Sequence, residues 1–235
     1  MTNVPLLSAS LAAILLSACA PAQVKLPAGL EPSAIAHAVS GHSPRRFNQP
    51  IHFGPYSARR MHEGDTFQWE ALMGRTALRG TERPYAFTVT TLGQPPVEVQ
   101  CDSRRKVLRH GDEDASLELD LAAVDGPLLA CGLRAAGSGP VHALELVQRA
   151  GRLEGGMDSP WGPLSIRSLH GYAGSPVTSM EASGFEVRRE GEAWMAVETL
   201  NAGRVLLAPT TDPRQRTYLA AVATALLLLD ADLGD

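Results

Sequence analysis

Residues 219–229 form an apolar run of eleven positions near the C-terminal end of the chain, interrupted only by Thr224. Such a run is hydrophobic on every side of a helix, as in a helix buried in a protein core, and it is well short of the ~20 residues that cross a bilayer. Asp212 can cap the helix start, and Gln215 three residues later supplies most of a capping box. The pattern therefore predicts a buried helix over residues 213–229.

Upstream of this run, from about residue 50, the chain carries short alternating patterns typical of β-strands. Apolar and polar positions alternate over residues 85–91 and 117–121. Residues 194–200 and 204–208 flank an Asn-Ala-Gly segment, which predicts a hairpin. Counted in this way, the sequence predicts about ten or eleven strands, mostly short.

An all-apolar helix cannot lie on the outside of a sheet without exposing its leucines to water, so the strands are expected to surround it. We therefore predict a mainly β domain over residues 47–235, with about ten to twelve strands in a barrel or strongly curved sheet around the C-terminal helix. The alternative is an α+β domain in which the helix packs on one face of a curved sheet.

The helix sequence RTYLAAVATALLLLD (residues 216–230) and the hairpin before it, EAWMAVETLNAGRVLLAP (residues 192–209), resemble the tubby-like superfamily. This superfamily includes the phospholipid scramblases and the LURP-one-related proteins. The resemblance implies a strand barrel threaded by a hydrophobic C-terminal helix and, more loosely, a role in binding or handling lipids.

The N-terminal residues have the layout of an export signal. Residues 1–18 are apolar and end in small residues, and Leu16-Ser17-Ala18-Cys19 resembles the lipobox at which bacterial lipoproteins are cleaved and acylated. Residues 1–18 are therefore predicted to be a lipoprotein signal peptide and Cys19 the lipidated residue. Ala20 favours the outer membrane, facing the periplasm. Residues 19–46, rich in Ala and Pro, are predicted to be a flexible lipid-anchored tether.

With Cys19 used for lipid, Cys101 and Cys131 remain as an even pair in an exported chain. Both fall on apolar faces of predicted strands. They are predicted to form a disulfide, with two free buried thiols as the alternative.

Candidate chemistry is sparse. The sequence has no GxSxG, HExxH or CxxC motif, so no catalytic residue, metal site or cofactor is predicted. Trp161, in the Gly- and Pro-rich residues 155–163, is predicted to belong to a binding loop or to cap the barrel end. His170 and Tyr172 follow a predicted strand and are candidates for the same binding surface.

The net charge of −4, without a basic stripe, excludes nucleic acid as an expected partner. The sequence thus predicts a non-enzymatic envelope lipoprotein that acts as a binding or structural module, held at the membrane through Cys19 and meeting an envelope protein or a lipid. Two alternatives are a lipid-handling protein and a hydrolase whose site would join His142 or His170 to a carboxylate and a nucleophile.

Overall fold

The structure is a computed structural model. The structure describes residues 21–30, 34–41, 49–65, 67–112, 115–120, 126–137, 139–209 and 211–233. The predicted signal peptide, residues 1–18, and the predicted lipidation site Cys19 lie outside the described residues.

Within these described residues, fourteen antiparallel strands form one sheet, and a pairing between β5 and β6 closes twelve of them into a barrel. The barrel strands are β1 (Ile35–Ser40), β2 (Ile51–Phe53), β3 (Tyr56–Glu63), β5 (Thr76–Thr90), β6 (Val97–Asp112), β8 (Leu129–Ala135), β9 (His142–Arg149), β10 (Arg152–Ser159), β11 (Gly162–Leu169), β12 (Gly184–Arg189), β13 (Glu192–Glu198) and β14 (Arg204–Leu207). Two further strands, β4 (Phe67–Met73) and β7 (Ala115–Asp120), lie outside the closed ring. The predicted barrel is confirmed, and the α+β alternative is excluded because the sheet closes.

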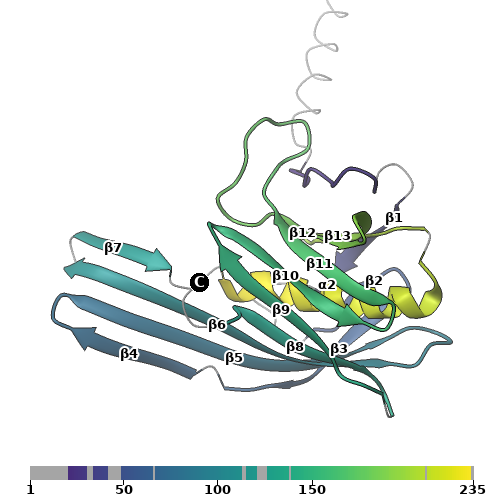
Figure 1. Cartoon of the computed structure of the whole chain (residues 1–235), viewed down its shortest axis with the longest axis horizontal. Coiled ribbons are helices and arrows are strands. Elements are labelled where there is room, and N and C mark those ends of the chain that lie inside the picture. The colour runs from purple at the N-terminus through teal and green to yellow at the C-terminus, as the bar shows by residue number, and fades with distance from the viewer. Residues whose placement is uncertain are drawn as a thin grey trace, which may run out of the picture.

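The C-terminal helix α2 (Pro213–Leu233) runs through the barrel (Figure 1). Residues 219–229 are each at most 2% exposed, so the helix is buried on all sides over this stretch. Thr224 is accommodated there because its hydroxyl donates to the Ala220 carbonyl at 2.9 Å. The predicted core helix is confirmed, with its end at Leu233 in place of residue 229.

The start of α2 has the predicted capping box. The Asp212 carboxylate accepts hydrogen bonds from the backbone N–H groups of Arg214 and Gln215 at 2.8 and 2.9 Å. In return, the Gln215 side chain accepts from the Asp212 N–H at 2.9 Å. These contacts satisfy N–H groups that the helix itself cannot pair, so the start of the helix is specified locally.

Cys101 and Cys131 form a disulfide, as predicted. They are register partners on the neighbouring strands β6 and β8, with their Cα atoms 4.1 Å apart. Both side chains are buried, so the bond lies within the barrel wall.

Replacing both cysteines by alanine is expected to lower the free energy of unfolding by about 3 kcal/mol, because the unfolded chain regains the entropy of a loop that the bond closes. Urea denaturation with and without reductant measures this difference. Reductant should lower the midpoint of the wild type toward that of the double variant and leave the variant unchanged. Equal stability of wild type and variant would contradict a structural role for the bond.

The described N-terminal residues are packed on the barrel. Residues 35–40 form β1, which pairs with β14 and closes the ring on that side. Residues 21–30 lie against the outside of β13 and β14, where apolar side chains form a second small core. Its members are Leu30, Ala193, Ala196, Leu206 and Ala208, with Leu26 and Ala34 partly buried against them. The prediction of a flexible tether over residues 19–46 is corrected for these described residues.

A buried carboxylate holds the N-terminal segment in place. Glu198 is 4% exposed, and its two oxygens accept hydrogen bonds from the Val24 N–H at 2.9 Å and from the Arg204 guanidinium at 2.8 Å. A buried carboxylate requires such partners, because an unpaired charge is costly to desolvate. This contact was not predicted from the sequence, because Val24 lies 174 residues from Glu198 in the chain.

Candidate functional site

The most distinctive surface is a four-stranded extension outside the barrel. β5 and β6 have 15 and 16 residues, whereas their barrel neighbours β3 and β8 have 8 and 7. The excess length projects past one end of the barrel as a ribbon flanked by β4 and β7, at the left of Figure 1. In the described sheet β4 and β7 each have one neighbour, so the extension ends in two open edges.

One face of the extension continues the inner surface of the barrel. Tyr85 of β5 points inward, where its hydroxyl donates to the Ala225 carbonyl of α2 at 3.3 Å. Every second residue of β5, counted from Tyr85, lies on this face, and so do the β6 residues paired with them. The arginines on it are Arg79, Arg83, Arg105 and Arg109. Arg79 is bound by Glu70 of β4 at 2.9 Å, with both side chains well exposed, so this pair is screened by water and contributes little stability.

The edge strand β4 carries an unusual concentration of exposed apolar side chains. Phe67, Leu72 and Met73 are 61%, 75% and 60% exposed. Of the eight large apolar side chains exposed in the described part of the chain, these three lie on one seven-residue edge strand. Edge strands in monomeric proteins are usually protected by charges or Pro, and the charge on β4, Glu70, is engaged with Arg79. This edge is the candidate binding site.

The place of residues 67–73 outside the barrel was not predicted from the sequence. The available signal is the run Ala71-Leu72-Met73, which breaks the alternation of a half-buried strand.

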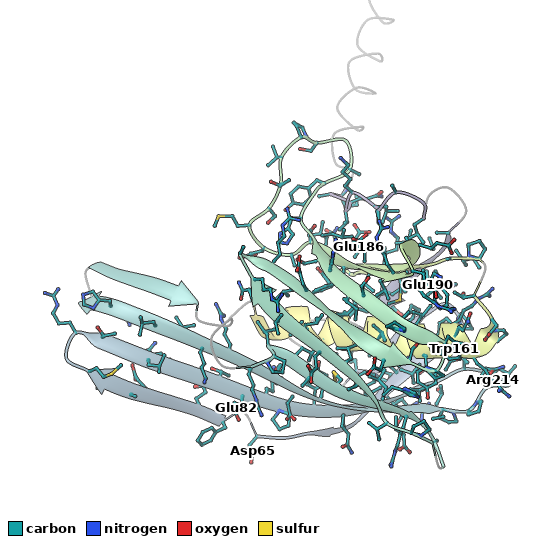
Figure 2. All side chains as sticks on the ribbon, in the orientation of Figure 1. Asp65, Glu82, Trp161, Glu186, Glu190 and Arg214 are labelled. Atoms are coloured by element: carbon teal, nitrogen blue, oxygen red, sulfur yellow. A yellow bond between two sulfur atoms is a disulfide. The ribbon has the colours of Figure 1, made fainter. Side chains whose placement is uncertain are left out.

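Trp161 lies at the end of the barrel where α2 begins. It sits in the two-residue turn between β10 and β11, and Figure 2 shows it near Arg214 at the start of the helix. Its ring is half-buried and meets Tyr218 edge-on, with ring centroids 5.4 Å apart. His142 contacts the same tyrosine ring at 5.8 Å. Burial raises the pKa of the Tyr218 hydroxyl. Of the two predictions for Trp161, these contacts agree with the one in which it caps the end of the barrel.

The Gly- and Pro-rich residues around Trp161 form a tight hairpin and not a long loop. Gly155 and Gly156 lie within β10. A Cβ atom at Gly155 would collide with the Glu145 carbonyl of β9, and one at Gly156 would lie 2.5 Å from the Leu164 carbonyl of β11. The two glycines thus allow β10 to pass closely between its neighbours, which is why the composition resembles that of a loop.

His170 and Tyr172 lie at the opposite end of the barrel from Trp161, in the connection between β11 and β12. His170 Nε2 is 2.8 Å from the Ser168 hydroxyl, and His170 Nδ1 is 3.2 Å from the Ser179 carbonyl. Tyr172 forms an isolated β-bridge with Val24 of the N-terminal segment. The three predicted loop residues therefore do not form one site.

The hydrolase alternative finds no support in these contacts. His142 packs against the Tyr218 ring, and the partners of His170 are a hydroxyl and a backbone carbonyl, without a carboxylate. The Ser168 hydroxyl already accepts a hydrogen bond from the Leu153 N–H at 3.0 Å, so it is held as a structural group. Within the described residues, no three His, Cys, Asp or Glu side chains gather in a way that could hold a metal ion.

Comparison of the chain with models of known protein families, with characterised proteins and with solved structures finds no match. The resemblance to the tubby-like superfamily stays a prediction. Among the described residues, no helix has both the length and the apolar character needed to span a membrane.

Proposed function

We propose that this protein is an envelope lipoprotein, anchored by acyl chains on Cys19 to the outer membrane and facing the periplasm, whose barrel is a non-enzymatic support. Its role is to present the edge strand β4 to another envelope protein. Three features support the anchor and the compartment: the apolar residues 1–18, the lipobox-like Leu16-Ser17-Ala18-Cys19, and the Cys101–Cys131 disulfide, a bond that persists in oxidising compartments.

The main support for a binding role is the exposed apolar edge of β4. An extended peptide can add to such an edge, with backbone hydrogen bonds giving affinity and alternate side chains giving specificity. Phe67 and Met73 lie on one face of β4 and Leu72 on the other, so an added strand would meet apolar side chains on both faces.

A second copy of the chain fits this edge less well. Antiparallel self-pairing of β4 in the register that opposes all seven residues would place Glu70 directly across from Glu70. Like charges in directly opposite positions destabilise a strand pair. The partner is therefore expected to be a different protein.

Lipid handling inside the barrel is disfavoured by the position of α2. The helix occupies the interior, and residues 219–229 are at most 2% exposed. An acyl chain would have to displace this helix or bind elsewhere on the molecule.

The binding role is tested by replacing Leu72 with a photoreactive phenylalanine analogue and irradiating intact cells. The matched control carries the same analogue at Leu92, which is 99% exposed in the turn between β5 and β6. The expected result is a discrete adduct with another protein at position 72, absent at position 92 and reduced when Phe67 and Met73 are both replaced by Lys. Equal labelling at both positions would contradict the proposal, as would an adduct of twice the mass of the chain, which would indicate self-association.

A further inference from the structure

Residues 23–25 are paired with one particular loop of the barrel. This loop, the 170–183 loop, connects β11 and β12. The Ala173 N–H donates to the Gln23 carbonyl at 2.8 Å, and the Lys25 N–H donates to the Gly171 carbonyl at 2.8 Å. The N-terminal segment and the loop therefore form a short antiparallel pairing and keep a defined relative position.

This pairing limits the distance between an acyl group on Cys19 and the barrel. The Ala22 carbonyl accepts a hydrogen bond from the Asn201 side chain at 3.0 Å, so the chain is held from Ala22 onward. Cys19 precedes Ala22 by three residues. Three extended residues span at most about 10 Å, so an acyl group on Cys19 would be attached within that distance of Ala22.

The 170–183 loop presents apolar side chains to solvent beside that point. Val177 and Met180 are 62% and 94% exposed. The loop is held in shape from within, because the Ser179 N–H donates to the His170 carbonyl at 2.7 Å and the Ser179 hydroxyl accepts from the Glu181 N–H at 3.1 Å. Its position above the barrel, on the side of residues 21–30, is visible in Figure 1.

The composition of the loop suits contact with a bilayer surface. Residues 170–183 contain one acidic residue, Glu181, one histidine, His170, and no Lys or Arg, and the others are mainly small or apolar, with Tyr172 among them. Few charges would lose water on contact with lipid, and tyrosine is favoured at the membrane–water boundary.

We propose that the 170–183 loop is a second membrane contact, which enters the headgroup region of the bilayer that holds the Cys19 anchor through Val177 and Met180. This inference rests on the proposed lipid anchor. The acyl chains on Cys19 hold the protein at the bilayer, and the loop adds an apolar contact of its own. The contact also fixes which end of the barrel faces the bilayer, with Trp161 and Leu92 at the far end.

The test uses the acylated full-length protein in vesicles of phosphatidylethanolamine and phosphatidylglycerol. A fluorophore is attached to Met180→Cys or, as the matched control, to Leu92→Cys, which is 99% exposed at the opposite end of the barrel. Quenching by lipids that carry a nitroxide on the acyl chain is then measured. We expect strong quenching at position 180 and almost none at position 92.

Flotation of the same vesicles tests the Cys19 anchor separately from the contact made by the 170–183 loop. Protein that floats but shows no quenching at position 180, or equal quenching at both positions, would overturn the second contact and leave the anchor intact. Protein that does not float would overturn the anchor and the inference together. As a supporting measurement, replacing both Val177 and Met180 by Asp is expected to speed transfer of the acylated protein between vesicles by at least about tenfold, since burying even one such side chain is worth this factor.

Discussion

The Leu226→Asp variant is expected to fail to fold. Leu226 is 0% exposed and lies in the middle of the stretch of α2 that fills the barrel. A carboxylate there would be surrounded by apolar side chains on every side and would have no partner, which costs several kcal/mol even if the group takes up a proton. Total stabilities of only about 5–15 kcal/mol leave little reserve, and the side chains of α2 form a large part of the barrel core.

The measurement is the soluble yield and the circular dichroism of Leu226→Asp, compared with those of Leu92→Asp. Leu92 is 99% exposed, so the same substitution there should leave folding unchanged. A soluble Leu226→Asp protein with a wild-type unfolding transition would show that the helix is not the core of the domain.

The helix was predictable because its signals are local. Ten apolar residues between positions 219 and 229, a capping aspartate and Gln215 lie within one continuous segment, and the structure forms both capping contacts. The hairpin between β13 and β14 was also predictable. In its turn, Asn201 and Gly203 adopt positive φ angles, 60° and 88°, that favour those residue types.

The extension was not predictable in the same way. Gly80 and Pro84 punctuate β5, so its 15 residues resemble a short strand preceded by a loop. Gly80 is nevertheless paired with Trp69 of β4 and Lys106 of β6, and these pairings keep the strand continuous. Propensity describes neighbours in sequence, whereas the length of β5 depends on its pairing with β6, from Thr76 opposite His110 to Val89 opposite Val97.

The N-terminal segment was mispredicted for a related reason. Residues 21–30 have no periodic pattern, because they cover small alanine side chains on the outside of β13 and β14 and form no regular element of their own. The carboxylate that holds them, Glu198, lies 174 residues away from Val24 in the chain. The disulfide was easier to predict, since two cysteines on apolar strand faces in an exported chain have few other roles.

The Cys19→Ser variant is expected to lose its membrane association. The serine side chain lacks the thiol on which acylation depends, and two exposed side chains of the 170–183 loop bind a bilayer too weakly to retain the protein by themselves. Cell fractionation measures the distribution between membrane and soluble fractions.

A second form of the same experiment controls for an uncleaved signal, which could itself hold the variant in the membrane. Residues 1–19 are replaced by a cleavable secretory signal without a lipobox, so that the domain is still exported and can form its Cys101–Cys131 disulfide. This protein is expected in the soluble periplasmic fraction. Retention in the membrane fraction would contradict anchoring through Cys19.

The most direct test of the lipoprotein assignment is the mass of the N-terminal peptide of the mature protein, isolated from envelopes. The predicted result is a peptide that begins at Cys19 and carries acyl chains, with residues 1–18 absent. A peptide that retains residues 1–18, or that contains Cys19 without lipid, would contradict the central claim.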